Sequence, residues 1–527
     1  MGQDRHDIGL RPNFLFILTD QHRADHLSCY GNRVLATPHI DSLAARGTLF
    51  DRFYVASAVC MPNRATLVTG RMPSQHGVRS NGISLPFDRR TFVEELAASG
   101  YRTALIGKCH LQNMTDRPAI GSGPTGHDAQ RGDAGDYDQE RRSRWRDPAH
   151  RITTPYYGFQ EIELANDHGD KVFGDYDRWL AERTPKPDEL RGPEHASPRG
   201  AYEVPQAWRT RLPEEFYPTH YVAERSVAWL ERHARNGEGD PFFLMTSFPD
   251  PHHPFTPPGR YWGMYDLADV PAPTTCRPPD ASSPPYLAAL QAERSAGKAP
   301  SGHARTIAVS PQEARAAIAL TYGMVAMVDD RVGMLLAALE RTGLAANTVV
   351  VFTSDHGDYM GDHGLLLKAP MHYQGIARVP FIWAEPERAS GKRCAGLAGT
   401  LDIAQTILAR AQVPEYHGMQ GQNLLSVIER AQACDSQAML LEEESQHPHP
   451  GFPAPVRART LVTSRYRLSL YDAVAWGELY DLENDPDEER NLWSDPASRA
   501  LRADMTEQLA RRMLALRDDC PRPTQSA

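Results

Sequence analysis

Cysteine is scarce in this sequence, and its few copies show no pairing pattern. The 527 residues contain 7 cysteines, and no two of them stand in a CxxC arrangement. We therefore expect neither a disulfide framework nor a zinc ribbon. The cysteines are Cys29, Cys60, Cys109, Cys276, Cys394, Cys434 and Cys520.

Long apolar runs and a surplus of positive charge are also absent. The apolar run Phe14–Leu18 is too short for the core of a signal peptide, and no run reaches the roughly 18 residues that a membrane span needs. Lys and Arg number 57 against 67 Asp and Glu, which gives a formal net charge of −10. This balance offers no electrostatic footprint for nucleic acid or an anionic membrane. We expect a soluble, cytoplasmic protein with neither of these partners.

The composition that remains is that of a globular protein. It is 41% hydrophobic and 24% charged, which excludes disordered, collagen-like and coiled-coil chains. Apolar residues spaced three and four apart predict a long helix over Glu313–Thr342. Buried strands are predicted at Phe14–Leu18, Thr103–Ile106, Pro241–Ser247 and Thr348–Thr353, and shorter helices at Leu43–Phe50 and Thr91–Ser99. Strands that alternate with helices over roughly 400 residues indicate a doubly wound α/β fold.

Two stretches interrupt this alternation, and the pattern changes toward the C-terminus. Residues 116–155 are rich in Gly, Asp and Arg, and residues 270–305 are rich in Pro, Ser and Ala. Both are predicted to be surface insertions that shape substrate access. Short alternating runs after residue 437 predict a small antiparallel sheet, closed by a helix over 496–516. We therefore divide the chain into a large α/β domain, 1–437, and a C-terminal α+β subdomain, 438–527.

Acidic residues follow two of the predicted strands directly. Asp20 and Gln21 come after the first strand, and Asp355 and His356 come after the run TVVVFT. Each pair alone also fits a purely structural role, in a turn that ends a strand or at a helix N-cap. If the two strands are neighbours, the four side chains meet at one edge of the sheet. Their oxygens and single imidazole would then suit Ca²⁺, Mg²⁺ or Mn²⁺.

A third cluster surrounds one cysteine. The run Cys60-Met61-Pro62-Asn63-Arg64 places Pro62 in the first turn of a predicted helix, so that Cys60 lies at its positive end. Helix N-termini bind anions and activate cysteines, and Arg64 adds a planar donor for a tetrahedral oxyanion. The alternative is a buried structural cysteine.

Dispersed cations form the fourth group of candidates. Lys108 and His110 follow the strand at 103–106, and His252 follows the strand at 241–247. Lys368 lies thirteen residues after Asp355. Each of them alone also fits a solvated surface charge, but cations that repeatedly follow strands point toward the same edge of the sheet.

These motifs together resemble one family. CMPNR fits the C-x-P-x-R signature of the type I sulfatases of the alkaline phosphatase superfamily. The segments ILTDQHRADHLSCYGN, IGKCHL, FTSDHGDYMGDHGLLLK and ELYDLENDPDEERNL look like that family too, in the same order along the chain. The likeness runs from about residue 12 to about residue 495 and is weakest in the two insertions. It implies an alkaline-phosphatase-like α/β sandwich with a large, mostly parallel sheet and a small C-terminal antiparallel sheet.

The resemblance also implies a mechanism. Cys60 would be converted to formylglycine by a formylglycine-generating enzyme, and the hydrated aldehyde would attack the sulfur of a sulfate ester. One divalent metal ion would assist, Ca²⁺ in the first place and Mn²⁺ or Mg²⁺ as alternatives. The metal-binding positions matched are Asp20, Gln21, Cys60, Asp355 and His356.

Six further positions match residues that handle the substrate and the nucleophile. Arg64 and Lys108 correspond to residues that steady formylglycine, and His110 corresponds to the residue that assists collapse of the covalent intermediate. His252 and Lys368 match residues that contact the sulfate oxygens and protonate the leaving group. Asn81 aligns with an active-site asparagine of the phosphonate monoester hydrolases.

The chain departs from the common family pattern at some positions. Asn63 stands where many members have Ser, and the Asp-Gln and Asp-His pairs resemble the phosphonate monoester hydrolase and choline-sulfatase-like branches. The GK-x-H-L form around Lys108 and His110 is that of sulfatases. We therefore rank sulfate monoester hydrolysis first and phosphonate monoester or phosphodiester hydrolysis second. A catalytically silent metal-binding protein of the same fold is the third hypothesis.

The organic half of the substrate has no readable code. Its pocket is predicted to be lined by the two insertions and the segment around His447–Arg459. The acidic run Glu442–Glu444 fits either a cationic substrate or a solvated loop. The size of the chain favours a homo-oligomer.

Overall fold

The central feature of the fold is a nine-stranded sheet. A computed structural model of the chain describes residues 11–119, 133–236, 239–297, 306–386, 391–430 and 436–525. The strands lie in the order β11-β2-β10-β8-β1-β6-β3-β4-β5. They are β1 (Asn13–Thr19), β2 (Thr48–Tyr54), β3 (Arg102–Gly107), β4 (Glu161–Asn166), β5 (Phe173–Gly174), β6 (Phe242–Ser247), β8 (Thr348–Ser354), β10 (Phe381–Ala384) and β11 (Lys392–Gly399). Neighbouring strands pair in parallel except where β10 and β5 are involved, so the expected mostly parallel sheet is confirmed.

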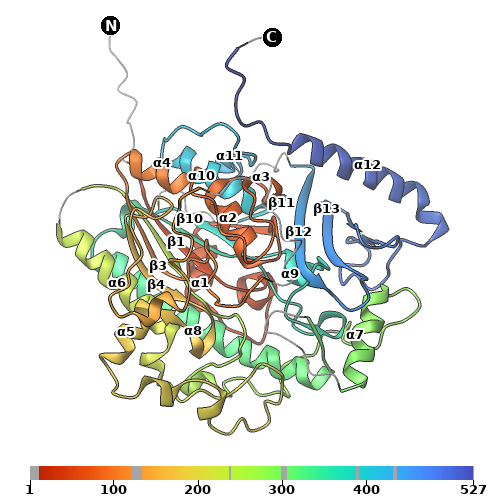
Figure 1. The fold of residues 1–527 in the computed structure, drawn as a ribbon, viewed down its shortest axis with the longest axis horizontal. Helices are drawn as coiled ribbons and strands as arrows, with labels where there is room; N and C mark the ends of the chain where they lie inside the picture. The colour runs from red at the N-terminus through yellow and green to blue at the C-terminus, as the bar shows by residue number, and fades with distance from the viewer. Residues whose placement is uncertain are drawn as a thin grey trace.

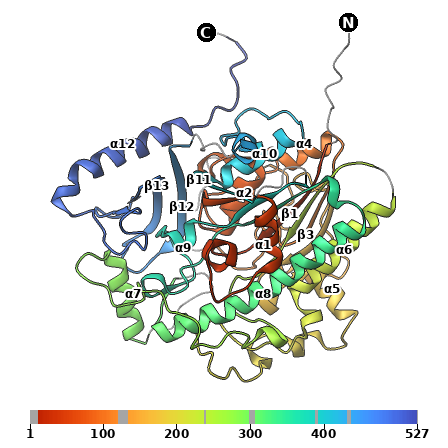
Figure 2. The same cartoon turned by 180° about the vertical axis from the view of Figure 1, so that it is seen from behind.

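Strand β1 shows why the sheet is covered on both faces. Its side chains alternate between two apolar cores, with Phe14 and Phe16 in one and Leu15 and Ile17 in the other. Helices supply the opposing surfaces (Figures 1 and 2). The first core contains α2 (Cys60–Thr69), α4 (Phe92–Ala98) and α10 (Ile403–Arg410). The second contains α1 (Pro38–Arg46), α6 (Pro218–Asn236) and α8 (Pro311–Arg341).

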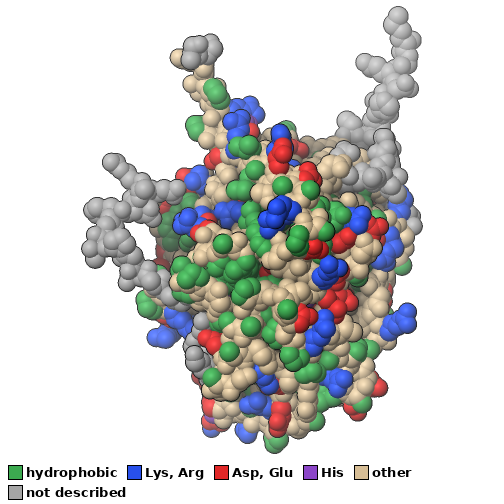
Figure 3. Space-filling view, turned by 90° about the vertical axis from the view of Figure 1, so that its right-hand side faces the viewer, with side chains coloured by type: hydrophobic (Ala, Val, Ile, Leu, Met, Phe, Trp, Pro, Cys, Tyr) green, Lys and Arg blue, Asp and Glu red, His purple; other side chains and the backbone are tan. Residues whose placement is uncertain are grey.

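A smaller antiparallel sheet lies beside this core, as the sequence predicts. It consists of β12 (Ala438–Pro448), β13 (Pro455–Thr463), β14 (Tyr466–Tyr471) and β15 (Glu478–Asp481) in that order. Helix α12 (Arg499–Ala515) buries Met505 and Leu509 against Leu461 and Leu468 of this sheet. Figure 1 shows β12 beside β11 and α12 at the outer edge of the molecule. Acidic and basic side chains are interspersed on this face (Figure 3).

Two helix predictions had different outcomes. The long helix is confirmed as α8, whose N-cap Ser310 accepts from the backbone N–H of Glu313 in a capping box. The helix expected at Leu43–Phe50 is wrong, because that segment holds the end of α1 and the start of β2. Gly47 separates the two elements, and a Cβ there would lie 2.4 Å from the carbonyl oxygen of Trp383.

The two insertions differ from each other. Within residues 270–305 the structure contains α7 (Pro285–Ser295), while residues 298–305 lie outside the described part. In the other insertion the described residues, 116–119 and 133–155, are irregular apart from a short 3-10 turn at Arg144–Arg146. Among the helices of the described segments, none combines the length and apolar character needed to cross a bilayer.

Candidate active site

The carboxyl ends of two neighbouring strands bring the predicted acidic residues together. β1 and β8 are parallel and pair Thr19 with Ser354, so that Asp20 and Asp355 leave the sheet side by side. Both side chains are fully buried. The backbone N–H of Gln21, which has φ of 61°, donates to Asp355 Oδ1 at 3.1 Å. The adjacency that the sequence left conditional is present.

Cys60 faces these carboxylates from the first turn of α2. Its side chain is 2% exposed, and Val59 is the N-cap residue. The Cys60 Sγ atom lies 3.9 Å from Asp20 Oδ1 and 3.1 Å from His356 Nε2. The sulfur therefore lies between the positive N-terminal end of α2 and the acidic residues at the strand ends.

The donor set fits a divalent cation. Ligand atoms of Asp20, Cys60, Asp355 and His356 all lie within 4.8 Å of one another, and all four residues are buried. The amide nitrogen of Gln21 is held by Asp358 and by His253 Nδ1, whereas its buried Oε1 atom has no hydrogen-bond partner. Buried carboxylate and amide oxygens with one imidazole are suitable ligands for Ca²⁺ or Mn²⁺.

Arg64, on α2, binds both carboxylates. Its Nε atom donates to Asp355 Oδ2 at 2.8 Å, and its Nη2 atom donates to Asp20 Oδ2 at 3.1 Å. The same guanidinium also donates to the backbone oxygen of Lys108 at 3.0 Å and to Ser247 Oγ at 3.1 Å. Arg64 thus fixes three loops at the sheet edge, and every oxygen it binds is buried.

Lys108 and His110 reach the same point from the end of β3. Lys108 Nζ is fully buried and donates to Asp20 Oδ2 at 2.5 Å. His110 has φ of 58°, and burial lowers the pKa of its imidazole to about 4 even though its contact with Cys60 acts in the other direction. Both residues therefore lie near Cys60, at the sheet edge where cations that follow strands were expected.

Lys368 and His252 close the other side of the site. Lys368 Nζ lies 3.0 Å from Cys60 Sγ, 2.8 Å from His356 Nε2 and 3.1 Å from His252 Nε2. Lys368 is 5% exposed and His252 is 4% exposed. Lys368 thus connects Cys60 to His252 within the buried interior.

The electrostatic balance around Cys60 favours an anion. Burial raises the pKa of the Cys60 thiol, but Lys368, Lys108 and His356 outweigh it and hold that pKa well below its ordinary value. Burial raises the pKa of Asp355, and the nearby carboxylate of Asp20 raises it further. A buried position that stabilises negative charge on residue 60 suits the transfer of an anionic group.

Asn81 binds the residue that follows Cys60. Its Oδ1 atom accepts from the backbone N–H of Met61 at 3.1 Å, which satisfies a free donor in the first turn of α2. Its backbone oxygen accepts from Gln446 in β12. Asn81 therefore joins the start of α2 to the small sheet.

Sequence reasoning missed two residues of this site. His168 Nε2 lies 2.5 Å from Lys108 Nζ, and its ring stacks on that of His252. Glu140, fully buried, accepts the backbone N–H groups of His110, Leu111 and Gln112. The signal for His168 was available, since Asp167 and His168 directly follow β4 in the way that Asp355 and His356 follow β8. Glu140 lies in an insertion without periodicity and gave no such signal.

The acidic run Glu442–Glu444 is neither a solvated loop nor an open cationic subsite. Glu442 and Glu443 are buried in β12. Ser74 donates to Glu442 through its backbone N–H at 2.8 Å, and Glu443 Oε2 lies 3.0 Å from His372 Nε2. Both interpretations of these two residues are wrong, because their carboxylates face buried partners within the protein.

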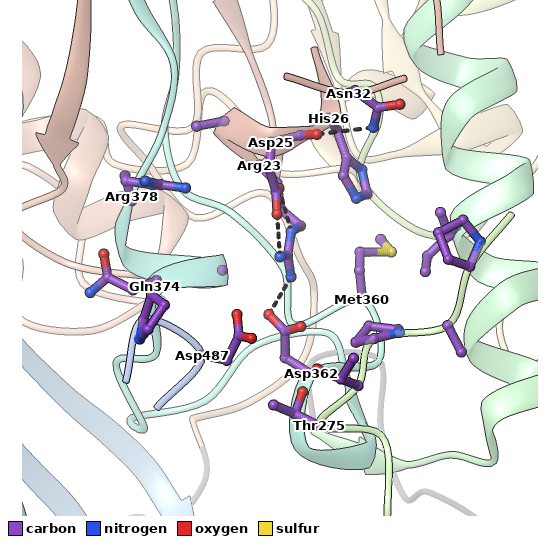
Figure 4. A pocket seen from close by; sticks show the side chains of 18 of the residues that line it. Arg23, Asp25, His26, Asn32, Thr275, Met360, Asp362, Gln374, Arg378 and Asp487 are labelled. Atoms are coloured by element: carbon purple, nitrogen blue, oxygen red, sulfur yellow. Dashed lines mark hydrogen bonds and ion pairs between the residues drawn. The ribbon is translucent and has the colours of Figure 1, made fainter. Parts of the chain in front are cut away.

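A polar cavity of about 420 Å³ lies on the far side of Arg23. Figure 4 shows Arg23 between Asp25 and Asp362, with Gln374 and Arg378 on another wall. Arg23 also donates to the backbone oxygen of Asp358 at 3.1 Å. Among the described residues, none of the catalytic or metal-binding candidates predicted from the sequence lines this cavity.

Comparison with known proteins agrees with this geometry. The Sulfatase family model matches residues 12–413, and the model described as N-sulphoglucosamine sulphohydrolase, C-terminal, matches residues 361–515. The uncharacterized sulfatase YidJ of Escherichia coli (strain K12) is 29% identical over 96% of this chain and 88% of its own length. The arylsulfatase of Clostridium perfringens is 28% identical over 92% of this chain and 90% of its own.

A solved structure shows the same architecture. The phosphonate monoester hydrolase of Agrobacterium radiobacter superimposes with a TM-score of 0.75 and 25% identity, over 97% of each chain. This places the fold in the alkaline phosphatase superfamily, as the motifs implied. Because one family model spans most of the sequence, the chain belongs to the sulfatase family and is a sulfuric ester hydrolase.

Proposed function

We propose that the protein hydrolyses sulfate monoesters with the help of one divalent metal ion and a nucleophile derived from Cys60. The observation that carries this proposal is the position of Cys60. Its Sγ atom lies at the buried start of α2, 3.0 Å from Lys368 Nζ, and it faces the carboxylate of Asp20. A cysteine held among cations and acidic strand ends is suited to bind and transfer an anionic group.

Asp20, Gln21, Asp355 and His356 would hold the metal ion together with residue 60. The unpartnered Oε1 atom of Gln21 supports this assignment, because a buried amide oxygen without a donor is otherwise costly. The four side chains offer oxygens and one imidazole, which favours Ca²⁺ and keeps Mn²⁺ as the alternative. The ion would supply positive charge where negative charge develops on the reacting oxygens.

Cys60 would act after conversion to formylglycine by a formylglycine-generating enzyme. One hydroxyl of the hydrated aldehyde would attack sulfur, and the alcohol would leave. The second hydroxyl would then lose its proton, and the C–O bond to the sulfate would break as the aldehyde is restored. His110, held against Cys60, would take a proton from the hydrate. Its low pKa keeps the imidazole neutral at physiological pH, as a base requires.

The remaining cations would receive the sulfate group and release the alcohol. Lys108 and Lys368 lie near residue 60, so their ammonium groups would neutralise the equatorial sulfate oxygens. Lys368 and His252, hydrogen-bonded to each other at 3.1 Å, are the candidates to protonate the leaving oxygen. Burial of both side chains would exclude competing water.

The test combines mass spectrometry with a matched pair of cysteine variants. We expect the tryptic peptide containing residue 60 to carry an aldehyde or its hydrate. Cys60→Ala is expected to abolish turnover of an aryl sulfate, whereas Cys276→Ala, which removes another buried free cysteine, should retain it. Turnover by Cys60→Ala at the wild-type rate would refute the mechanism.

A phosphonate monoester or phosphodiester hydrolase with the same nucleophile is the second candidate. The similarity to the phosphonate monoester hydrolase of Agrobacterium radiobacter favours it, because that solved structure matches nearly the whole chain. A comparison of kcat/KM for an aryl sulfate and a phenyl phosphonate ester decides between the two. A preference of orders of magnitude for the phosphonate would reverse the ranking.

A further inference from the structure

Asp167 and His168 form an ordered pair at the end of β4. His168 Nε2 lies 2.5 Å from Lys108 Nζ, and its Nδ1 atom lies 3.2 Å from Asp167 Oδ1. Because the ammonium of Lys108 can only donate, Nε2 accepts and the proton resides on Nδ1. Arg142 holds the other Asp167 oxygen at 2.6 Å, so the imidazole is fixed in both tautomer and direction.

The ring of His168 stacks on His252. Their centroids are 3.4 Å apart and the planes are inclined by 11°. His252 has the same arrangement of partners, because its Nδ1 atom lies 2.5 Å from the backbone oxygen of His253 and its Nε2 atom lies 3.1 Å from Lys368 Nζ. The site therefore contains two Lys–His pairs, Lys108 with His168 and Lys368 with His252. The two histidine rings stack on each other, and each lysine binds one of them.

The loops that carry the two rings are fitted to each other. Gly169, which follows His168, has φ of 54° and lies against the segment after His252. A Cβ at this position would lie 2.7 Å from Thr256 Oγ1 and 2.9 Å from the backbone oxygen of Pro254. The absence of a side chain at Gly169 thus permits the close approach that the stack requires.

We propose that His168 is a positioning residue for protonation of the leaving group. Its ring fixes the plane of His252, and its Nε2 atom holds Lys108 against Asp20. This inference rests on the proposed function. As the S–O bond breaks, its electron pair stays on the leaving oxygen, which takes a proton from the Lys368–His252 pair. The attacking hydroxyl gives up one proton in the same turnover, so the proton count is unchanged.

Removal of each of the two contacts of His168 is expected to lower the rate of hydrolysis in a different way. A leaving group such as 4-nitrophenolate departs without much protonation, whereas phenolate needs the proton. Loss of the ring stack should therefore slow the hydrolysis of esters with poor leaving groups more than that of esters with good ones. Loss of the Lys108 contact should slow both equally, because Lys108 does not act on the leaving oxygen.

The experiment measures kcat/KM for a series of aryl sulfates with leaving groups of different pKa. His168→Ala removes both contacts. We expect it to lower kcat/KM about tenfold for 4-nitrophenyl sulfate and about 100- to 1,000-fold for phenyl sulfate, mainly through kcat. His168→Phe keeps a stacked ring without the acceptor, and we expect a uniform loss of about tenfold with the wild-type dependence on leaving group.

His233→Ala is the matched control. His233 stacks on Trp229 in α6 and packs on Phe242 at the opposite, amino end of β6. We expect this variant to keep the wild-type rates across the series. Thermal melting of each variant reports whether it folds, and His168→Phe keeps the test valid if His168→Ala does not.

Three outcomes discriminate. If His168→Ala lowers kcat/KM by the same factor for all leaving groups, the positioning role is overturned. It is also overturned if kcat/KM of His168→Phe depends on leaving-group pKa as strongly as that of His168→Ala. The same series with aryl phosphonate esters tests the role if the enzyme prefers phosphorus. Inactivity of the wild type on both series, with the aldehyde verified at residue 60, would refute the proposed function and this inference with it.

Discussion

The side-chain amide of Asn63 donates a hydrogen bond of 2.6 Å to the backbone oxygen of Asp355. Its carbonyl oxygen accepts from the backbone N–H of Ala56 at 3.0 Å. One buried side chain thus connects the first turn of α2, the segment before it and the end of β8. The separation between Cys60 and the acidic strand ends depends on this bridge.

We expect Asn63→Ala to reduce both stability and activity. The change leaves the Ala56 N–H and the Asp355 oxygen buried without partners, which should lower the free energy of unfolding by about 2–4 kcal/mol. Displacement of Cys60 should lower kcat/KM about 10- to 100-fold. Urea unfolding and aryl sulfate kinetics measure the two effects. Asn423→Ala, at an exposed helix start, is the control and should keep full activity.

Glu140 gives a second prediction, on the loop that carries Lys108 and His110. Its carboxylate accepts three consecutive backbone N–H groups, at 2.7–3.1 Å, and also binds Asn166 and Tyr156. Glu140→Ala removes all of these bonds. We expect a loss of at least about 3 kcal/mol in unfolding free energy and a fall in kcat, because the loop loses its fixed shape.

Hydrogen exchange checks that prediction at the loop itself. The backbone amides of Leu111 and Gln112 should exchange faster in Glu140→Ala than in the wild type. Glu189→Ala, which removes an exposed ion pair with Lys186, should leave both the exchange and the activity unchanged. Unaltered protection of the Leu111 and Gln112 amides would contradict the role given to Glu140.

Strand ends were the most informative signal in the sequence, and the structure shows why. Parallel neighbours such as β1 and β8 deliver their carboxyl ends to one edge, so acids that follow them meet whatever the distance along the chain. The sequence could therefore pair Asp20 with Asp355 on the condition that their strands are neighbours, which the structure shows. His168 follows a strand in the same way, but Asp167-His168 matched no family motif in the sequence.

Residues that act by holding backbone were not predictable. Glu140 lies in an irregular insertion, and its role depends on three N–H groups of a loop about thirty positions earlier in the chain. The acidic run around Glu442 looked solvated because charge alone does not reveal a buried partner. Ser74 and His372, which bind these carboxylates, come from elements of the large domain distant in sequence.

The small sheet contains a buried charge imbalance that makes stability depend on pH. Arg467 is fully buried and donates to Glu478 at 2.9 Å and to Glu488. Burial raises the pKa of Glu488 from 4.5 to about 7, although Arg467 acts in the opposite direction. One guanidinium does not compensate two buried carboxylates, so the folded state keeps a proton that the unfolded chain releases.

The sign of the effect follows from proton counts. Between pH 4.5 and about 7 the folded state binds more protons at Glu488 than the unfolded state, so the free energy of unfolding falls as pH rises. We expect the wild type to lose about 3 kcal/mol relative to Glu488→Gln across this window. Urea unfolding at several pH values measures the difference. For Glu483→Gln, a change at an exposed neighbour, the free energy of unfolding should depend on pH as in the wild type. The same pH dependence in Glu488→Gln and the wild type would contradict the raised pKa of Glu488.

Chelation should separate the catalytic role of the proposed metal ion from its contribution to the stability of the fold. Arg64 and Lys108 already neutralise Asp20 from the protein side, so we expect EDTA to abolish aryl sulfate turnover while the melting temperature changes by only a few degrees. Added Ca²⁺ or Mn²⁺ should restore activity, and the more effective ion identifies the preferred metal. Gln21→Ala removes the unpartnered Oε1 atom and should raise the half-restoring metal concentration about 10- to 100-fold, whereas Gln508→Ala on the exposed face of α12 should not. Full turnover after exhaustive chelation would exclude a metal from the mechanism.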